Sequence, residues 1–334
     1  MIKFGVVGIG LRGQLFADTI VQNPYANLVA ICDSNEQSLR HAITRYKDVN
    51  TYQDVQQMMN DEALDAVVVA TPDFLHKLPV MLAAERSIHV MVEKPFSTSV
   101  EEAEEMAEAV KQSGIKCMVA FENRWNPPFV NVSERIHRGD LGRIVAMNSR
   151  LNDTIYVPTK MLKWSNNTSP GWFLLSHSID LACYWKQTQP VTVYAVGTKQ
   201  KLMAMGIDTY DSIQATVTFA DQTSATFTSS WILPETLPMM VDFKFEIIGE
   251  EGALYVDMQD QMVQQAGVVY EHVPTVGTSI NGRLLAPPNH MLDAFIDNIR
   301  LNTEPLTGPK DGLINTKLIN AIHRSVERRD NVEI

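Results

Sequence analysis

A chain of 334 residues is longer than one hydrophobic core usually organises, and its 45% apolar and 20% charged residues are typical of a globular protein, so we expect two domains. The formal net charge of −11, without any cluster of Lys and Arg, argues against a nucleic-acid or anionic-membrane surface and favours a small-molecule partner. No apolar stretch approaches the ~18 residues that a membrane helix needs. Because the first residues pass directly into a strand pattern without a signal peptide, we expect a cytoplasmic protein.

The cysteines also agree with a cytoplasmic location. Cys32, Cys117 and Cys183 are far apart, lie in apolar surroundings and form no CxxC or Cys/His ligand spacing. They predict reduced core residues and no metal site.

The first 121 residues alternate short apolar runs with amphipathic stretches. Because hydrophobicity within each run is continuous rather than alternating, each run predicts a strand buried on both faces. This arrangement is typical of a parallel, doubly wound α/β sheet with helices on either side. The strands are expected at residues 2–7, 28–32, 66–70, 88–92 and 117–121, with helices at 12–21, 34–46 and 73–85.

One further helix is marked at both ends. In "TSVE", Thr98 and Glu101 can form a capping box, and Gly114 can supply a left-handed C-terminal cap. We therefore expect a helix between these residues.

After residue 122 the pattern changes, and we interpret residues 122–334 as a second domain built on a largely antiparallel sheet. Apolar and polar residues alternate around the turn "ADQT" (220–223), which is a hairpin signature and predicts a sheet with one covered face. Residues 277–289 are the best candidate for a long mobile loop. Strands are expected at residues 144–151, 191–197, 213–219, 225–227, 241–248, 253–256 and 262–273, and helices near 128–137, 172–185, 290–299 and 311–328.

The segment "GVVGIGLRG" predicts a dinucleotide site. Gly8, Gly10 and Gly13 have the G-x-G-x-x-G spacing between the first strand and the first helix, where glycines permit a tight turn, close approach of a pyrophosphate and close helix packing. The helix N-terminus, with Leu11 and Arg12, faces the phosphate charge. Arg12 is either a phosphate contact or a solvent-facing helix residue. Alone, the motif is weak, and a glycine-rich turn is the alternative.

An acidic residue twenty positions beyond the third glycine strengthens this interpretation. Asp33 ends the second strand, where a carboxylate accepts hydrogen bonds from a ribose 2′-hydroxyl and repels a 2′-phosphate, so NAD is favoured over NADP. The loop "VATPDFLH" follows a strand at the same edge of the sheet, so we expect Thr71 and Pro72 to lie beside the cofactor. His76 is either a third neighbour or a helix-surface histidine.

The segment "VMVEKPFS" ends a buried strand with Glu93 and Lys94. A buried ammonium is costly unless it has partners or a chemical task, so we expect Lys94 to donate to a substrate oxygen. Pro95, through a trans or a cis peptide, fixes the following turn and aims the lysine. Glu93 is either an anchor for cofactor or backbone, or a charge partner.

In this order, "GIGLRG", "ATPDFLH", "EKPFS" and "FENRWNPPF" resemble the Gfo/Idh/MocA family of NAD(P)-dependent oxidoreductases over essentially the whole chain. The "EKP" is the more specific of these motifs. The resemblance implies a Rossmann domain at residues 1–121, followed at 122–334 by a substrate-binding and oligomerisation α/β domain with an open, mainly antiparallel sheet. It also implies a homodimer or homotetramer formed through that sheet, and a sugar or polyol substrate.

The resemblance further implies a helix bearing Asp-x-x-x-His, whose histidine transfers a proton. In "GWFLLSHSIDLACYW" (171–185), His177 and Asp180 match, but Phe173 stands at the position of the Asp. The three residues share one helix face, so we expect them at the substrate. A buried core histidine is the alternative for His177. Since no further ligand with recognisable spacing accompanies them, a zinc site is not expected.

Two more segments belong to the expected site. The resemblance places Asn123 and Arg124, which follow the last strand of the first domain, near the nicotinamide and the substrate. Lys163 and Trp164 precede the histidine helix, where an aromatic face can stack on a sugar ring. An ordinary exposed loop is the alternative for this pair.

We therefore expect an NAD-dependent oxidoreductase in which a hydroxyl carbon of a sugar or polyol gives a hydride to nicotinamide C4, while Lys94 and His177 manage the hydroxyl proton. Two alternatives remain. One is a glycosidase that uses transient oxidation by bound NAD to allow elimination, and the other is a non-catalytic regulator that binds dinucleotide or sugar. Phe173 favours these alternatives slightly, whereas Lys94 and His177 together favour catalysis.

Overall fold

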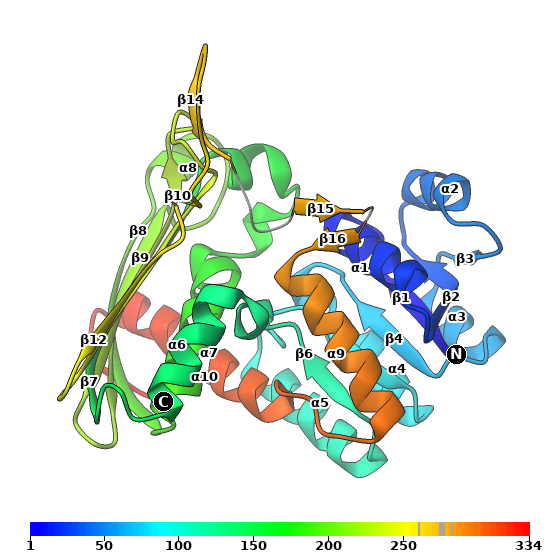
Figure 1. Ribbon diagram of the computed structural model, residues 1–334, viewed down its shortest axis with the longest axis horizontal. Coiled ribbons are helices and arrows are strands. Elements are labelled where there is room, and N and C mark those ends of the chain that lie inside the picture. The colour runs from blue at the N-terminus through cyan, green and yellow to red at the C-terminus, as the bar shows by residue number, and fades with distance from the viewer. Residues whose placement is uncertain (260, 274–277, 282) are drawn as a thin grey trace. The chain divides into compact units, whose positions relative to one another are not determined.

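The computed structural model describes residues 1–334 except 260, 274–277 and 282 (Figure 1). The chain divides into two compact units. Residues 1–122 and 279–316 form the first unit, and residues 123–278 and 317–334 form the second. The C-terminal part of the chain therefore contributes to both units.

A six-stranded parallel sheet forms the centre of the first unit, in the order β3-β2-β1-β4-β5-β6. All its neighbouring pairs are parallel, which confirms the doubly wound fold. The strand order reverses beside β1, and ligands of such sheets bind outside the carboxyl ends of the strands at this switch point. The strands are β1 (Ile2–Val7), β2 (Ala26–Cys32), β3 (Asn50–Tyr52), β4 (Ala66–Val69), β5 (His89–Val92) and β6 (Cys117–Val119).

Residues 279–316 return to the first unit and pack against its N-terminal part. The ring of Phe295 in α9 meets that of Phe4 in β1 edge to face, with 6.5 Å between centroids. The described residues of 277–289 form strands β15 (Thr278–Ile280) and β16 (Arg283–Leu285) and the start of α9, so the loop predicted there is wrong, while residues 277 and 282 lie outside the described residues. The helices of this unit are α1 (Leu11–Gln22), α2 (Glu36–Arg45), α3 (Val55–Asp61), η1 (Asp73–Leu75), α4 (Lys77–Glu85), α5 (Val100–Ser113) and α9 (Pro287–Leu301).

The ends of α5 test the capping prediction. Gly114, with a φ of 67°, caps the C-terminus as predicted. At the other end the cap is Ser99, whose hydroxyl accepts a hydrogen bond from the Glu102 amide at 3.3 Å. The capping box predicted from Thr98 therefore lies one residue too early, because a serine that can cap the helix stands directly after that threonine.

A seven-stranded mixed sheet forms the second unit, in the order β12-β11-β7-β10-β9-β8-β17. Its pairs are antiparallel except β7 with β10, which confirms the mainly antiparallel sheet. Buried and less buried residues alternate along β9 and β10, so one face carries the core. The strands are β7 (Ile144–Thr154), β8 (Pro190–Thr198), β9 (Ser212–Phe219), β10 (Ser224–Leu233), β11 (Val241–Gly249), β12 (Ala253–Asp257) and β17 (Val332–Glu333).

The helices of the second unit differ from prediction in one respect that matters for the site. The helix predicted at 172–185 begins as a π-helical segment, η5 (Gly171–Leu175), and continues as α7 (Ser176–Lys186). The strand predicted at 262–273 is a hairpin of β13 (Gln264–Ala266) and β14 (Tyr270–His272). The remaining elements are η2 (Glu122–Trp125), α6 (Pro127–His137), η3 (Val157–Met161), η4 (Ser165–Asn167), α8 (Lys201–Ala204) and α10 (Pro309–Arg328).

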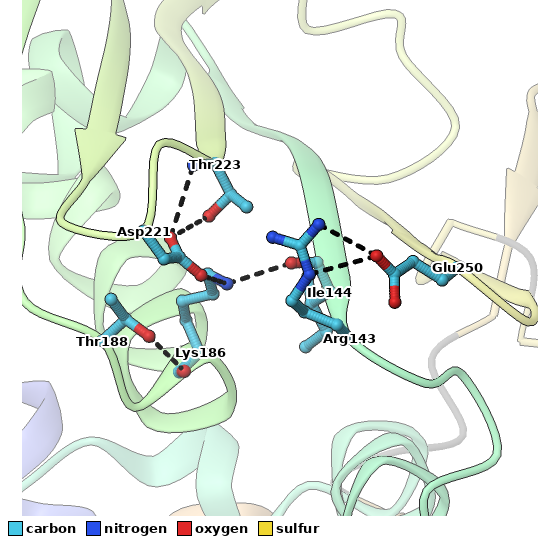
Figure 2. A network of polar contacts seen from close by, with 7 residues as sticks. All are labelled: Arg143, Ile144, Lys186, Thr188, Asp221, Thr223 and Glu250. Carbon is cyan, nitrogen blue, oxygen red and sulfur yellow. Dashed lines mark hydrogen bonds and ion pairs between the residues drawn. The ribbon is translucent and has the colours of Figure 1, made fainter.

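Lys186 fixes the C-terminal end of α7 to the sheet (Figure 2). Its ammonium lies 2.5 Å from the Asp221 carboxylate in the β9–β10 turn and donates to the Ile144 carbonyl at the start of β7, at 2.9 Å. The hydrogen bond from Lys186 is the largest of the effects that lower the pKa of Asp221 to about 2. Because α7 carries His177, this contact positions one end of the predicted site helix.

Two absences hold for the described residues. Within them, no helix is both long and apolar enough to cross a membrane, and no group of His, Cys, Asp and Glu could hold a metal ion. Cys32 and Cys117 are buried free thiols, and burial raises the pKa of each to about 12. Both thiols therefore stay protonated at neutral pH.

Candidate functional site

The glycine loop between β1 and α1 has one glycine that faces open space. An added Cβ would lie 2.7 Å from the Ala70 carbonyl oxygen at Gly8, whose φ is +86°, and 1.8 Å from the Gly8 carbonyl oxygen at Gly13. At Gly10 it would meet no atom of the described residues within 4 Å. Packing therefore requires Gly8 and Gly13, whereas an approaching ligand would require the glycine at position 10.

Among the described residues, no side chain caps the first turn of α1. Gly10 is the N-cap and makes no side-chain capping bond, and the side chain of Leu11 is 74% exposed. Open amides and the helix dipole favour an anion at this end. Arg12, by contrast, forms ion pairs with Glu93 and Glu122.

Asp33 is fixed at the carboxyl end of β2. One carboxylate oxygen accepts from the Ile9 amide of the glycine loop at 2.8 Å, and the other accepts from the Asn35 amide at 2.8 Å. These two bonds hold the carboxylate beside the loop, and each oxygen keeps a lone pair for a further donor.

The loop after β4 contains a polar atom without a partner. The hydroxyl oxygen of Thr71 is buried and has no hydrogen bond among the described residues, while Pro72 is half-buried and is the N-cap of η1. His76 is buried, so the alternative of a helix-surface histidine is wrong. Its Nδ1 lies 2.8 Å from the Pro95 carbonyl oxygen, and its Nε2 lies 3.2 Å from that of Thr71. It thus ties this loop to the turn after Lys94, where the Lys94–Pro95 peptide is cis.

Lys94 lies among charged side chains. Burial has the largest effect and lowers the pKa of the Lys94 ammonium below its ordinary value. Glu93, Glu122 and Asp73 favour the charged form, and Arg12 opposes it. The lowered pKa increases the fraction of neutral amine, which can accept a proton.

In the second unit, two amides orient His177. Asn126 Nδ2 donates to Asn123 Oδ1 at 3.3 Å, and Asn123 Nδ2 lies 3.2 Å from Nδ1 of the half-buried His177. Since Asn123 faces the ring with its amide nitrogen, the neutral imidazole carries its proton on Nε2.

Arg124 and Asp180 form a buried ion pair. The guanidinium donates from Nε and Nη2 to the two carboxylate oxygens at 3.0 and 2.6 Å, and the side chains are 3% and 2% exposed. The guanidinium also lies over the Tyr184 ring, 4.3 Å from its centroid. This bidentate contact ties η2, which carries Asn123, to α7, which carries His177.

Aromatic rings surround Phe173. Its centroid lies 6.3 Å from that of Trp164 and 6.2 Å from that of Trp231. Trp231 is fully buried and donates from its indole to the Tyr210 carbonyl at 2.6 Å, whereas Trp164 and Phe173 are partly exposed and Lys163 is exposed. Phe173 is thus part of an aromatic cluster with Trp164 and Trp231, and its own side chain is apolar.

The start of η5 rests on a partly buried histidine. His323 Nδ1 donates to the Ile319 carbonyl at 2.8 Å, so Nε2 accepts from the Ser169 hydroxyl at 2.7 Å. Trp172 stacks on the imidazole with 5.2 Å between centroids, and its amide donates to Ser169 Oγ at 3.2 Å. Burial lowers the pKa of His323, which keeps the ring neutral, as this bonding pattern requires.

Sequence reasoning missed several of these residues. Glu122 follows the end of β6 much as Glu93 follows β5, and that position was the available signal. Asn126 carries only the weak signal of a second amide three residues after Asn123. Nothing in the sequence relates Trp231 to the site helix, because that contact depends on how η5 packs on β10.

Two family models match the chain. The model of an oxidoreductase family with an NAD-binding Rossmann fold matches residues 2–121, and the model of the Gfo/Idh/MocA C-terminal domain matches residues 129–255. The chain belongs to the Gfo/Idh/MocA family. The predicted Rossmann fold, oxidoreductase class and NAD cofactor are thereby confirmed.

Relatives within the Gfo/Idh/MocA family cover nearly the full chain. Scyllo-inositol 2-dehydrogenase (NAD(+)) of Bacillus subtilis is 24% identical over 95% of this chain and 92% of that protein. Inositol 2-dehydrogenase of Rhizobium meliloti is 24% identical over 100% of this chain and 99% of that protein. Among solved structures, myo-inositol 2-dehydrogenase of Lactobacillus plantarum superposes with a TM-score of 0.89 at 20% identity, covering 100% of this chain and 99% of that one. These structures share the fold.

The residues of the first unit fit the NAD that this Gfo/Idh/MocA fold implies. The open position at Gly10 and the uncapped start of α1 would hold the pyrophosphate. Asp33 would accept from the ribose hydroxyls. The unpartnered hydroxyl of Thr71 offers a further hydrogen bond at the same edge of the sheet.

The two loop glycines give a paired prediction. Gly10→Ala places a methyl group in the open space where the pyrophosphate would lie, so we expect thermal stability within about 0.5 kcal/mol of wild type but NADH affinity at least about tenfold weaker. Gly13→Ala drives a methyl group into the Gly8 carbonyl, so we expect a loss of about 1–3 kcal/mol in the free energy of unfolding. Thermal unfolding and calorimetric titration measure both effects. Unchanged NADH affinity in folded Gly10→Ala would contradict the cofactor position.

Asp33 predicts the choice of cofactor. We expect NADH to bind more tightly than NADPH, because the carboxylate accepts from ribose hydroxyls and repels a 2′-phosphate. Asp33→Ala should narrow this difference. Asp33→Asn, which keeps an acceptor and removes the charge, separates the two causes. Calorimetric titration of both cofactors measures the effect, and equal or reversed wild-type affinities are incompatible with the assignment.

Proposed function

We propose that this chain is an NAD-dependent dehydrogenase that transfers a hydride between the cofactor and a CH–OH carbon of a polyol or sugar. The observation that carries the proposal is the Lys94 amine, which follows the carboxyl end of β5 and whose pKa is lowered by burial. The names of the two full-length relatives, both inositol 2-dehydrogenases, support a cyclic polyol.

Bound NAD would accept the hydride at nicotinamide C4. The chain's own residues manage the proton of the substrate hydroxyl. As a neutral amine, Lys94 accepts this proton during oxidation, and as an ammonium it returns the proton during reduction. A pKa below the ordinary lysine value makes the neutral, proton-accepting amine more accessible than it is in an exposed lysine.

His177 is the second group that we assign to proton transfer. With Asn123 donating to Nδ1, the Nε2–H of His177 donates a hydrogen bond or a proton to a substrate oxygen. A half-turn of the Asn123 amide would let Oδ1 accept from Nδ1–H, and Nε2 would then be the nitrogen that accepts a proton. The two arrangements suit the two directions of the reaction.

The aromatic cluster supports a ring-shaped substrate. Trp164 and Phe173 are partly exposed, and aromatic faces bind the C–H face of a sugar or cyclitol ring. The hydroxyl groups of such a ring need hydrogen-bonding partners in addition to these aromatic faces.

Lys94→Met tests the proposal directly. We expect NADH affinity close to wild type but turnover lower by ~10²-fold or more, because a positioned proton-transfer group is lost while the methylene stem is kept. Lys47→Met, at an exposed position, is the matched control. The assay follows NADH formation with a panel of inositols, other polyols and sugars.

The same panel includes nitrophenyl glycosides. Release of nitrophenol without net cofactor reduction would indicate a glycosidase, and NAD binding without turnover of any compound would indicate a regulator. Either result, or full turnover by Lys94→Met, overturns the proposed dehydrogenase mechanism.

Phe173→Asp tests the role of His177 through pH. An Asp one helical turn before the imidazole would stabilise its charged form, whereas Phe offers only an apolar face. Since a base must be unprotonated to accept the hydroxyl proton, the acidic limb of the oxidation rate profile should move to higher pH. Phe173→Leu should leave this limb in place. An unchanged profile in folded Phe173→Asp, together with full activity of His177→Ala, would make His177 a packing residue.

A further inference from the structure

We propose that Arg12 is a positioning residue for Lys94: its guanidinium pairs with Glu93 and Glu122, two carboxylates that would otherwise favour the Lys94 ammonium, and thereby keeps Lys94 available as a proton acceptor. The use of that amine rests on the proposed function. The ionic arrangement itself can be tested without substrate or cofactor.

Arg12 joins three connections of the parallel sheet. Arg12 lies in the first turn of α1. Its Nε donates to Oε1 of Glu93, the residue after β5, at 2.6 Å, and its Nη2 pairs with Oε2 of Glu122, which follows β6. Because a guanidinium presents several donors in a fixed plane, one side chain can hold both carboxylates at once. Arg12 therefore acts as a clamp across the carboxyl edge of the sheet.

The clamp is connected to the backbone of Lys94. While Glu93 Oε1 accepts from Arg12, its Oε2 accepts from the Lys94 amide at 3.1 Å. The Glu93 side chain is only 8% exposed, so solvent screens this pair less than a surface ion pair. Both oxygens of Glu93 are thus engaged, and its orientation beside Lys94 is fixed.

The balance of charge at Lys94 gives the clamp a chemical consequence. Glu93, which follows β5, Glu122, which follows β6, and Asp73, which follows β4, each favour the ammonium, while Arg12 of α1 opposes it. With Arg12 present, the carboxylates are partly compensated. Without Arg12, three carboxylates would face a single ammonium, and Lys94 would hold its proton more strongly.

A clamp on the two carboxylates and a phosphate contact differ in what the loss of Arg12 should change. A phosphate-binding arginine would mainly contribute cofactor affinity. A clamp on Glu93 and Glu122 would mainly change the protonation of Lys94, and the change would be present in the protein without cofactor.

Competitive acetylation of the full-length protein without cofactor measures this protonation. Trace acetic anhydride reacts with neutral amines, and mass spectrometry of the peptide containing Lys94 gives its rate against pH. In Arg12→Met we expect about tenfold slower labelling of Lys94 at a pH below the wild-type midpoint, because a cation close to the amine is lost. Arg40→Met, which breaks the exposed Arg40–Glu36 pair on α2, should leave labelling unchanged.

A second variant predicts the opposite sign. Glu122→Gln removes one carboxylate and should speed labelling, and the double variant Arg12→Met with Glu122→Gln should return toward the wild-type rate. Labelling of folded Arg12→Met within twofold of wild type overturns the proposal, as does slower labelling of Glu122→Gln. If Arg12→Met does not fold, Glu122→Gln alone decides, since a purely structural role predicts no change in its midpoint.

Enzyme assays then separate this inference from the proposed function. In Arg12→Met the part of the polyol-oxidation profile that follows the protonation of Lys94 should move to higher pH, in parallel with the labelling midpoint. If the wild-type protein oxidises no polyol, the proposed function fails, while the labelling result still decides whether Arg12 controls Lys94.

Discussion

The cost of removing charge from water governs the carboxyl edge of the parallel sheet. The strands that lead to this edge are buried, yet Glu93 and Lys94 follow one of them directly. Buried charges destabilise a fold unless neighbouring groups compensate them. Arg12 and Glu122 supply that compensation from two other connections, so the surroundings of Lys94 and the integrity of this edge depend on the same ion pairs.

In the second unit, contacts at the start, middle and end hold the helical segment that carries His177. Ser169, bonded to His323, supports its first turn; Asp180, paired with Arg124, holds its middle; and Lys186 anchors its end to the sheet. The partners come from distant parts of the sequence. His177 is therefore placed by the tertiary structure around its helix, and the local helical pattern alone does not determine where its ring lies.

The sequence could predict features that depend on local residue patterns, but not those that depend on contacts between distant residues. Continuous apolar runs identified β1, β4 and β5, and the glycine spacing identified the cofactor loop, because those signals are local. β3 (Asn50–Tyr52) is short and polar and gave no such signal. Arg12 was recognised only as a phosphate or surface residue, since its partners stand 81 and 110 positions away. The π-helical start of the site helix also has no distinctive residue pattern.

The return of the chain to the first unit has a consequence for biosynthesis. Domains usually fold in order as they leave the ribosome. Here Phe4 packs against Phe295, and Gly312 lies against the Phe96 side chain, so the nucleotide-binding unit lacks part of its core until most of the chain has been made. A nascent chain that has reached only residue 279 would still expose the apolar surface that α9 covers. Loss of residues 279–316 would therefore remove part of the unit that begins at the N-terminus.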